Sequence, residues 1–163
     1  MNAREATKAG IEMAAFVCNA YLDDLSDAQL LERPLPGANH IAWQLGHLIN
    51  SEHDMLSAVK PGAMPPLPEG FAAKHNKETA ASDNPADFLT KAEYQRLAQE
   101  QRAATYALLE SMSDEQLSEP GPEAMRSYCP TVGSVFTMQG SHWLMHGGQW
   151  AIVRRKLGKP PLF

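Results

Sequence analysis

Residues 131–157 read TVGSVFTMQGSHWLMHGGQWAIVRRKL. Apolar side chains recur along it at the spacing of a helix, and two histidines, His142 and His146, stand four residues apart among them. Thr131 is a favoured N-terminal capping residue, and Gly158 directly after the stretch is a favoured residue for ending a helix. The stretch therefore predicts one long, largely buried helix that carries a pair of imidazoles.

Three other stretches have the pattern or composition of helices. Apolar residues at steps of three and four predict a first helix from 3 to about 25. Asn39 is the expected cap of a second helix that runs to Lys60. A segment rich in Ala, Leu, Gln, Glu and Arg predicts a third helix over residues 85–112.

The segment 61–83, between the second and third helices, contains too many prolines to be helical. It is also longer than the about two to eight residues that usually join neighbouring antiparallel helices. We therefore expect a long crossover loop, which allows helices two and three to run parallel and helices two and four antiparallel. With 163 residues, the chain has the length of a single all-α domain, 1–163, built as a four-helix bundle.

Composition argues against several classes of protein. The chain has 14 Lys+Arg against 19 Asp+Glu and a formal charge of −5, so it has no electrostatic reason to bind nucleic acid. It contains no apolar run of membrane-spanning length and no signal-peptide pattern, so we expect no membrane association. Its two cysteines form no CxxC pair, which favours a reducing, cytoplasmic location.

Histidines are the strongest chemical signal. At 3.6 residues per turn, His142 and His146 project about 40° apart, one turn above the other, and can share an ion. His47 lies in the other strongly apolar helix, and antiparallel packing would bring the three imidazoles together. The pattern is compatible with one bound divalent metal, and equally with histidines that are hydrogen-bonded within the core. The three other histidines, His40, His53 and His75, are expected to be exposed or capping.

Glu52 interrupts the apolar stripe of the second helix. A buried carboxylate needs a partner, and Glu52 is our candidate catalytic residue, either as a base or as a support for a ligand imidazole. An equally good interpretation is a salt bridge to Arg96 or Arg102.

The stretch Asn39–His47, followed by Glu52 and then by His142-xxx-His146 with Gly-Gly-Gln after it, resembles the DinB-like (DinB/YfiT) superfamily of small metal-dependent enzymes. The resemblance covers both histidine helices and the four-helix layout. It implies an up-down-down-up bundle in which His47, His142 and His146 bind a zinc or nickel ion.

The same resemblance implies an open three-histidine site that activates water or a small thiol. Such a site is most similar to that of thiol-dependent transferases, which join a low-molecular-weight thiol to an electrophilic small-molecule substrate, while other relatives resemble hydrolases. The alternative is a non-catalytic interaction or stress-associated module in which the metal only staples the helices.

Aromatic residues also recur at steps of seven in the last helix, beside glycines that allow close approach of another backbone. We expect this stripe to form the interface of a homodimer, unless the core or the long loop buries it. Its residues are Phe136, Trp143 and Trp150, with Gly140 and Gly147 beside them.

Overall fold

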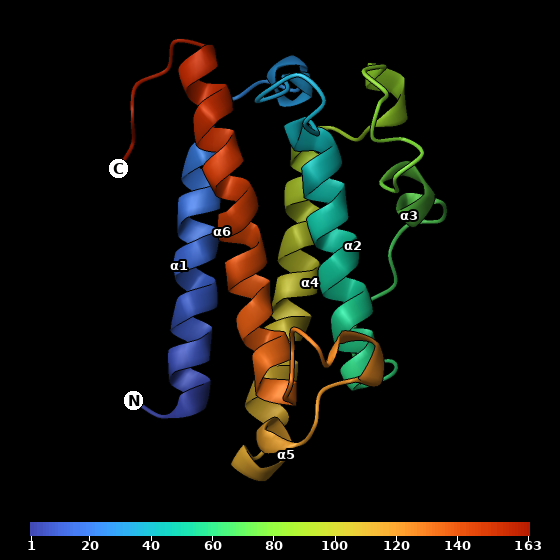
Figure 1. Ribbon diagram of the computed structural model, residues 1–163, viewed down its shortest axis with the longest axis vertical. Coiled ribbons are helices and arrows are strands. Elements are labelled where there is room, and N and C mark those ends of the chain that lie inside the picture. Colours follow the sequence, from blue (N-terminus) through green and yellow to red (C-terminus); the bar gives the residue numbers. More distant parts are fainter.

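The computed structural model describes residues 1–163 and is entirely helical, without a β-strand. Figure 1 shows its four long helices, which are α1 (Ala3–Asp23), α2 (Ile41–Val59), α4 (Lys91–Ser111) and α6 (Val132–Lys156). Short helical turns lie between them: η1 (Ala28–Leu31), α3 (Phe71–Lys74), η2 (Pro85–Asp87), α5 (Asp114–Ser118) and η3 (Glu123–Met125). The predicted all-α class is confirmed. None of these helices combines the length and the apolar character needed to cross a lipid bilayer.

The last helix begins and ends where the sequence predicts. The side chain of Thr131 accepts a hydrogen bond from the backbone N–H of Ser134, and the side chain of Ser134 accepts one from the backbone N–H of Thr131, so a capping box starts α6. At the other end Gly158 has a φ of +73°, in the left-handed region that favours glycine. Local sequence alone is enough to set both ends.

The starts of the two middle helices differ from the prediction. His40, rather than Asn39, caps α2, because its Nδ1 accepts a backbone N–H from the first turn. The α4 helix begins at Lys91, about six residues later than predicted, since Thr90 forms its own capping box there. The preceding segment Pro85–Asp87 is a separate 3₁₀ turn.

Polar contacts between helix ends give the relative directions of the helices. Gln44, near the start of α2, donates a hydrogen bond to Gln149, near the end of α6. Met55, near the end of α2, accepts one from Gln139, near the start of α6. The two helices are therefore antiparallel, while α2 and α4 both begin at the upper end of the bundle in Figure 1.

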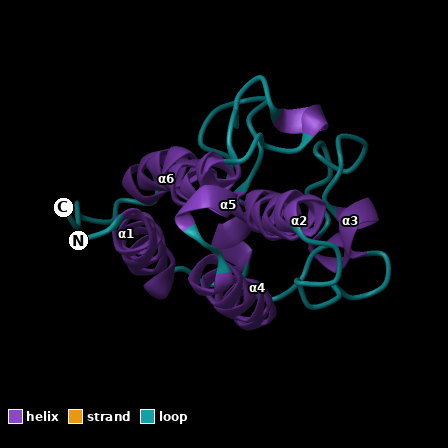
Figure 2. Cartoon of the chain, turned by 90° about the horizontal axis from the view of Figure 1, so that it is seen from below, coloured by secondary structure: helices purple, strands orange, loops and turns teal.

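Glycines bring α1 and α6 into close contact. A Cβ atom on Gly140 would lie 3.2 Å from the carbonyl oxygen of Gly10, and one on Gly147 would lie 3.0 Å from the Cys18 sulfur. Seen from below the bundle, the two helices pack side by side, with α2 and α4 completing the four (Figure 2). The close approach predicted for these glycines thus occurs within the chain, against its own first helix.

The aromatic stripe of α6 belongs to the core. Phe136 and Trp150 have no exposed surface and Trp143 is 6% exposed, because all three face the interior of the bundle. The prediction that this stripe forms a dimer interface is therefore wrong. A homodimer through another surface stays a prediction.

The crossover loop is anchored through His75, which is buried rather than exposed as predicted. Its Nδ1–H donates to the carbonyl oxygen of Phe71, at 2.8 Å, and its Nε2 accepts from the Tyr94 hydroxyl, at 2.7 Å. Burial lowers the pKa of His75 to about 4, so the ring is neutral at pH 7. Gly46 makes room for it, since a Cβ there would lie 2.0 Å from the imidazole ring.

We expect Gly46→Ala to lower the free energy of unfolding by about 1–3 kcal/mol, because the added methyl group overlaps the His75 ring. The matched control is Gly148→Ala, also within a helix, where a Cβ has no neighbour within 4 Å. That control should be neutral or stabilising by up to about 1 kcal/mol. Urea unfolding followed by circular dichroism measures both, and equal effects of the two changes would contradict the packing role of Gly46.

Candidate metal centre

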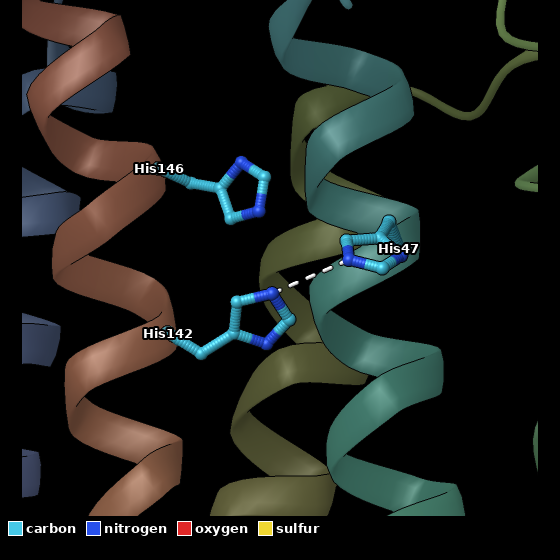
Figure 3. Close-up of side chains that lie close together, drawn as sticks. All are labelled: His47, His142 and His146. Atoms are coloured by element: carbon cyan, nitrogen blue, oxygen red, sulfur yellow. Dashed lines mark hydrogen bonds between the residues drawn. The ribbon is translucent and has the colours of Figure 1, made fainter. Parts of the chain in front are cut away.

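The three predicted ligand histidines lie together in the structure. His47 comes from α2, and His142 and His146 come from adjacent turns of α6, with all three half-buried. Their rings point toward one another across the space between the two helices (Figure 3). One ring nitrogen from each lies within 4.8 Å of the others, so the three imidazoles can share one ion.

The separation of the His47 and His142 rings would suit a tetrahedral metal. The Nε2 atoms of His47 and His142 are 3.3 Å apart. Two imidazoles bound at about 2.0–2.1 Å with a tetrahedral angle would place their nitrogens about 3.3–3.4 Å apart. The donor set, three nitrogens without a carboxylate or thiolate, is the one found in catalytic zinc sites and also suits nickel.

All three imidazoles are held in the neutral form that a metal requires. Burial lowers the pKa of His47, and burial together with the neighbouring His47 lowers the pKa of His142 to about 4. For His146 the pKa is also lowered to about 4, by burial first and then by the two other histidines. At pH 7 each ring therefore keeps a nitrogen lone pair.

Gln44 determines which nitrogen of His146 is free. Its side-chain oxygen accepts from Trp150 Nε1–H at 2.8 Å, which identifies this atom as the oxygen because an indole nitrogen is only a donor. The same oxygen lies 3.0 Å from His146 Nδ1, so Nδ1 carries the proton. The lone pair is left on Nε2, and an outer hydrogen bond of this kind orients a ligand and raises its basicity.

Trp43 positions the His47 ring. Its ring is stacked on His47, with centroids 5.2 Å apart and planes 10° from parallel. Its indole N–H donates to the carbonyl oxygen of Asn76 at 3.0 Å, which connects this stack to the crossover loop. The loop thus supports the His47 ring indirectly.

Glu52 lies elsewhere. It is 1% exposed, and its two carboxylate oxygens accept from Arg102 Nη2 at 2.9 Å and from the Thr105 hydroxyl at 2.6 Å. It makes no hydrogen bond to any of the three histidines. Of the two interpretations of this residue, the structure therefore favours the ion pair with Arg102, and a catalytic role for Glu52 stays a prediction.

Sequence reasoning missed Gln44 as part of the centre. The available signal was a polar residue on the buried side of an apolar helix, three residues before His47. Gln149 accepts from the Gln44 amide at 3.0 Å. His53 stays outside the cluster, with its Nδ1 3.3 Å from the Gln101 side-chain oxygen.

Comparisons with known proteins identify the family of the chain. A family model of the DinB superfamily matches residues 17–150, which includes all three histidines. The chain belongs to the DinB superfamily. No curated protein matches it. The chain is similar in fold to a conserved protein from Enterococcus faecalis whose crystal structure is known, with a TM-score of 0.71 and 16% identity over 98% of this chain and 99% of that one.

We expect Gln44→Met to weaken metal affinity about 10- to 100-fold, because His146 loses the acceptor that orients it. The matched control is Gln139→Met, a second buried glutamine, which bonds to Val135 and Met55 rather than to a histidine. Zinc titration against a competing chelator measures the affinity. Equal losses in both variants would reject the orienting role of Gln44.

Glu52→Gln should lower the free energy of unfolding by about 3–5 kcal/mol, because it leaves the buried Arg102 charge without its counterion. Metal affinity should stay at the wild-type value, since Glu52 makes no hydrogen bond to the three histidines. Chemical unfolding and metal titration of the same preparation separate the two roles. A loss of metal affinity at unchanged stability would support the catalytic or ligand-supporting interpretation instead.

Proposed function

We propose that this DinB superfamily member is a metal-dependent enzyme that uses an open three-histidine site to activate a small thiol or water. The observation that supports it is the convergence of three neutral imidazoles at one half-buried point between α2 and α6. Three protein ligands leave a position free for a reacting molecule, whereas structural zinc sites use four. Thiol-dependent transfer to an electrophilic small molecule is the favoured reaction.

Residues of the chain have separate tasks in this proposal. His47, His142 and His146 would hold one zinc or nickel ion, which when bound lowers the pKa of a coordinated thiol or water toward neutral. Gln44 keeps the proton of His146 on Nδ1. Trp43 holds the His47 ring by stacking, which fixes the direction of its lone pair.

The chain's own thiols are poor nucleophiles. Cys18 has no exposed surface, and burial raises its pKa to about 12, so it stays protonated at pH 7. Cys129 is also buried, and burial raises its pKa. An external thiol is therefore the more suitable sulfur nucleophile.

The proposal is tested first by elemental analysis of protein purified without a histidine tag. About one divalent ion per chain is expected, and His146→Ala should remove most of it because only two ligands remain. His53→Ala is the matched control, a half-buried histidine of the same helix as His47 but outside the cluster, and should keep the ion.

Metal-loaded protein is then screened for transfer of glutathione, bacillithiol or mycothiol to an aryl halide, and for ester hydrolysis. Turnover that is lost in His146→Ala and kept in His53→Ala is the expected result. A bound ion without turnover in any assay would favour a metal-stapled interaction module. A chain that binds no divalent ion would reject the metal centre and assign the histidines to core packing.

A further inference from the structure

A cavity of about 320 Å³ lies between α1 and α4, and none of the three clustered histidines lines it. Polar side chains of Asn19 and Gln99 stand at its exposed edge. Its deeper wall is formed by Arg102 and Trp143, which are 9% and 6% exposed. Its size is at the lower end of the about 300–1,000 Å³ typical of small-molecule sites.

Clamped helix ends and small side chains create this cavity. At one end Lys8 of α1 pairs with Glu110 of α4, with 2.6 Å between nitrogen and oxygen. At the other end the Lys91 ammonium donates to the carbonyl oxygen of Leu25 at 2.6 Å. Between these contacts the facing positions are mostly occupied by alanines, which cannot fill the space: Ala15, Ala98 and Ala103.

Two hydrogen-bond donors in the deeper wall have no partner. They are the indole Nε1 of Trp143 and the Nη1 of Arg102, and they are the only buried side-chain polar atoms of the chain left unpaired. The other two tryptophans differ, since Trp43 donates to Asn76 and Trp150 donates to Gln44. A buried donor without an acceptor is costly, so an oxygen acceptor that reaches these two atoms would be favoured.

The charge balance indicates what kind of acceptor fits. The Arg102 guanidinium lies over the Trp143 ring, 5.5 Å from its centroid, and its other nitrogen, Nη2, already binds Glu52 at 2.9 Å. Because this carboxylate neutralises the guanidinium, a second buried anion would carry an uncompensated charge. A neutral carbonyl oxygen satisfies the donors without that cost.

We propose that the cavity between α1 and α4 is a second binding site, which takes a neutral small molecule with an apolar or aromatic body and a carbonyl oxygen. The carbonyl accepts from Trp143 Nε1–H and Arg102 Nη1–H, and the apolar body packs against the alanines and Tyr106. The site is independent of the metal centre, so it stands whether or not the chain is an enzyme.

Benzamide is a suitable probe, and the three indole N–H signals in a ¹H–¹⁵N spectrum are the readout. Benzamide should shift the Trp143 indole signal, while the Trp43 and Trp150 signals stay in place because protein oxygens already bind those donors. Toluene, which has the ring but no acceptor, and benzoate, which is charged, should both bind more weakly than benzamide.

Variants of the cavity test its location. Ala98→Leu fills the cavity and should abolish the shift, and Ala103→Leu, at an exposed lining position, serves the same purpose if the first variant does not fold. The matched control is Ala92→Leu, on the exposed side of α4 and outside the cavity. This variant should bind benzamide as tightly as the wild-type protein does. Circular dichroism checks that each variant is folded.

Removal of one donor tests the chemistry. Trp143→Phe keeps the aromatic packing and should weaken the affinity for benzamide about 2- to 10-fold. Because this variant lacks the indole signal, binding is followed through the backbone amide signals of residues 95–103. If the Trp143 indole signal of the wild-type protein does not move at any benzamide concentration up to the solubility limit, the proposal is overturned. That result is expected when water already satisfies the two donors. A shift that persists in the filled variants, or toluene or benzoate binding as tightly as benzamide, would also overturn the proposal.

Discussion

The hydrogen bonds of one buried amide, that of Gln44, hold together the half of the molecule that contains the three clustered histidines. A glutamine side chain has two N–H donors and two acceptor lone pairs, and all four are used here. The nitrogen donates to Asn39 and Gln149, and the oxygen accepts from His146 and Trp150. Because a buried amide is costly when unpaired, this set of bonds permits only one register between the start of α2 and the end of α6. That register places His47 opposite the histidine pair.

Helix α6 serves two chemically different regions with neighbouring residues. His142 belongs to the group of three neutral imidazoles. Trp143, the next residue, is rotated by about 100° around the helix and lines the cavity between α1 and α4. Arg102 lines that cavity and is paired with Glu52, and Glu52 makes no hydrogen bond to the histidines. The carboxylate of Glu52 neutralises the Arg102 guanidinium, so this buried cation has its own counterion.

Features governed by neighbouring residues in the chain were predictable, and features governed by distant ones were less so. The ends of α6 depend on Thr131 and Gly158, which act within a few residues, and both were predicted. His75 looked like an exposed loop residue because nothing near it in sequence requires burial. Its environment comes from Gly46 and Tyr94, which lie 29 and 19 residues away along the chain.

The all-helical class and the His142–His146 pair could be predicted from the chain, because helical periodicity and a four-residue spacing are local properties. His47 was joined to that pair through the apolar pattern of its own helix and the family resemblance. The partner that each buried polar group contacts became known only from the packing of the helices. Glu52 had two good interpretations until α4 placed Arg102 beside it, and the aromatic stripe became core once glycines let α1 approach. The physical reason is that hydrogen bonds and close packing act over a few ångströms, between residues whose distance along the chain carries no record of that proximity.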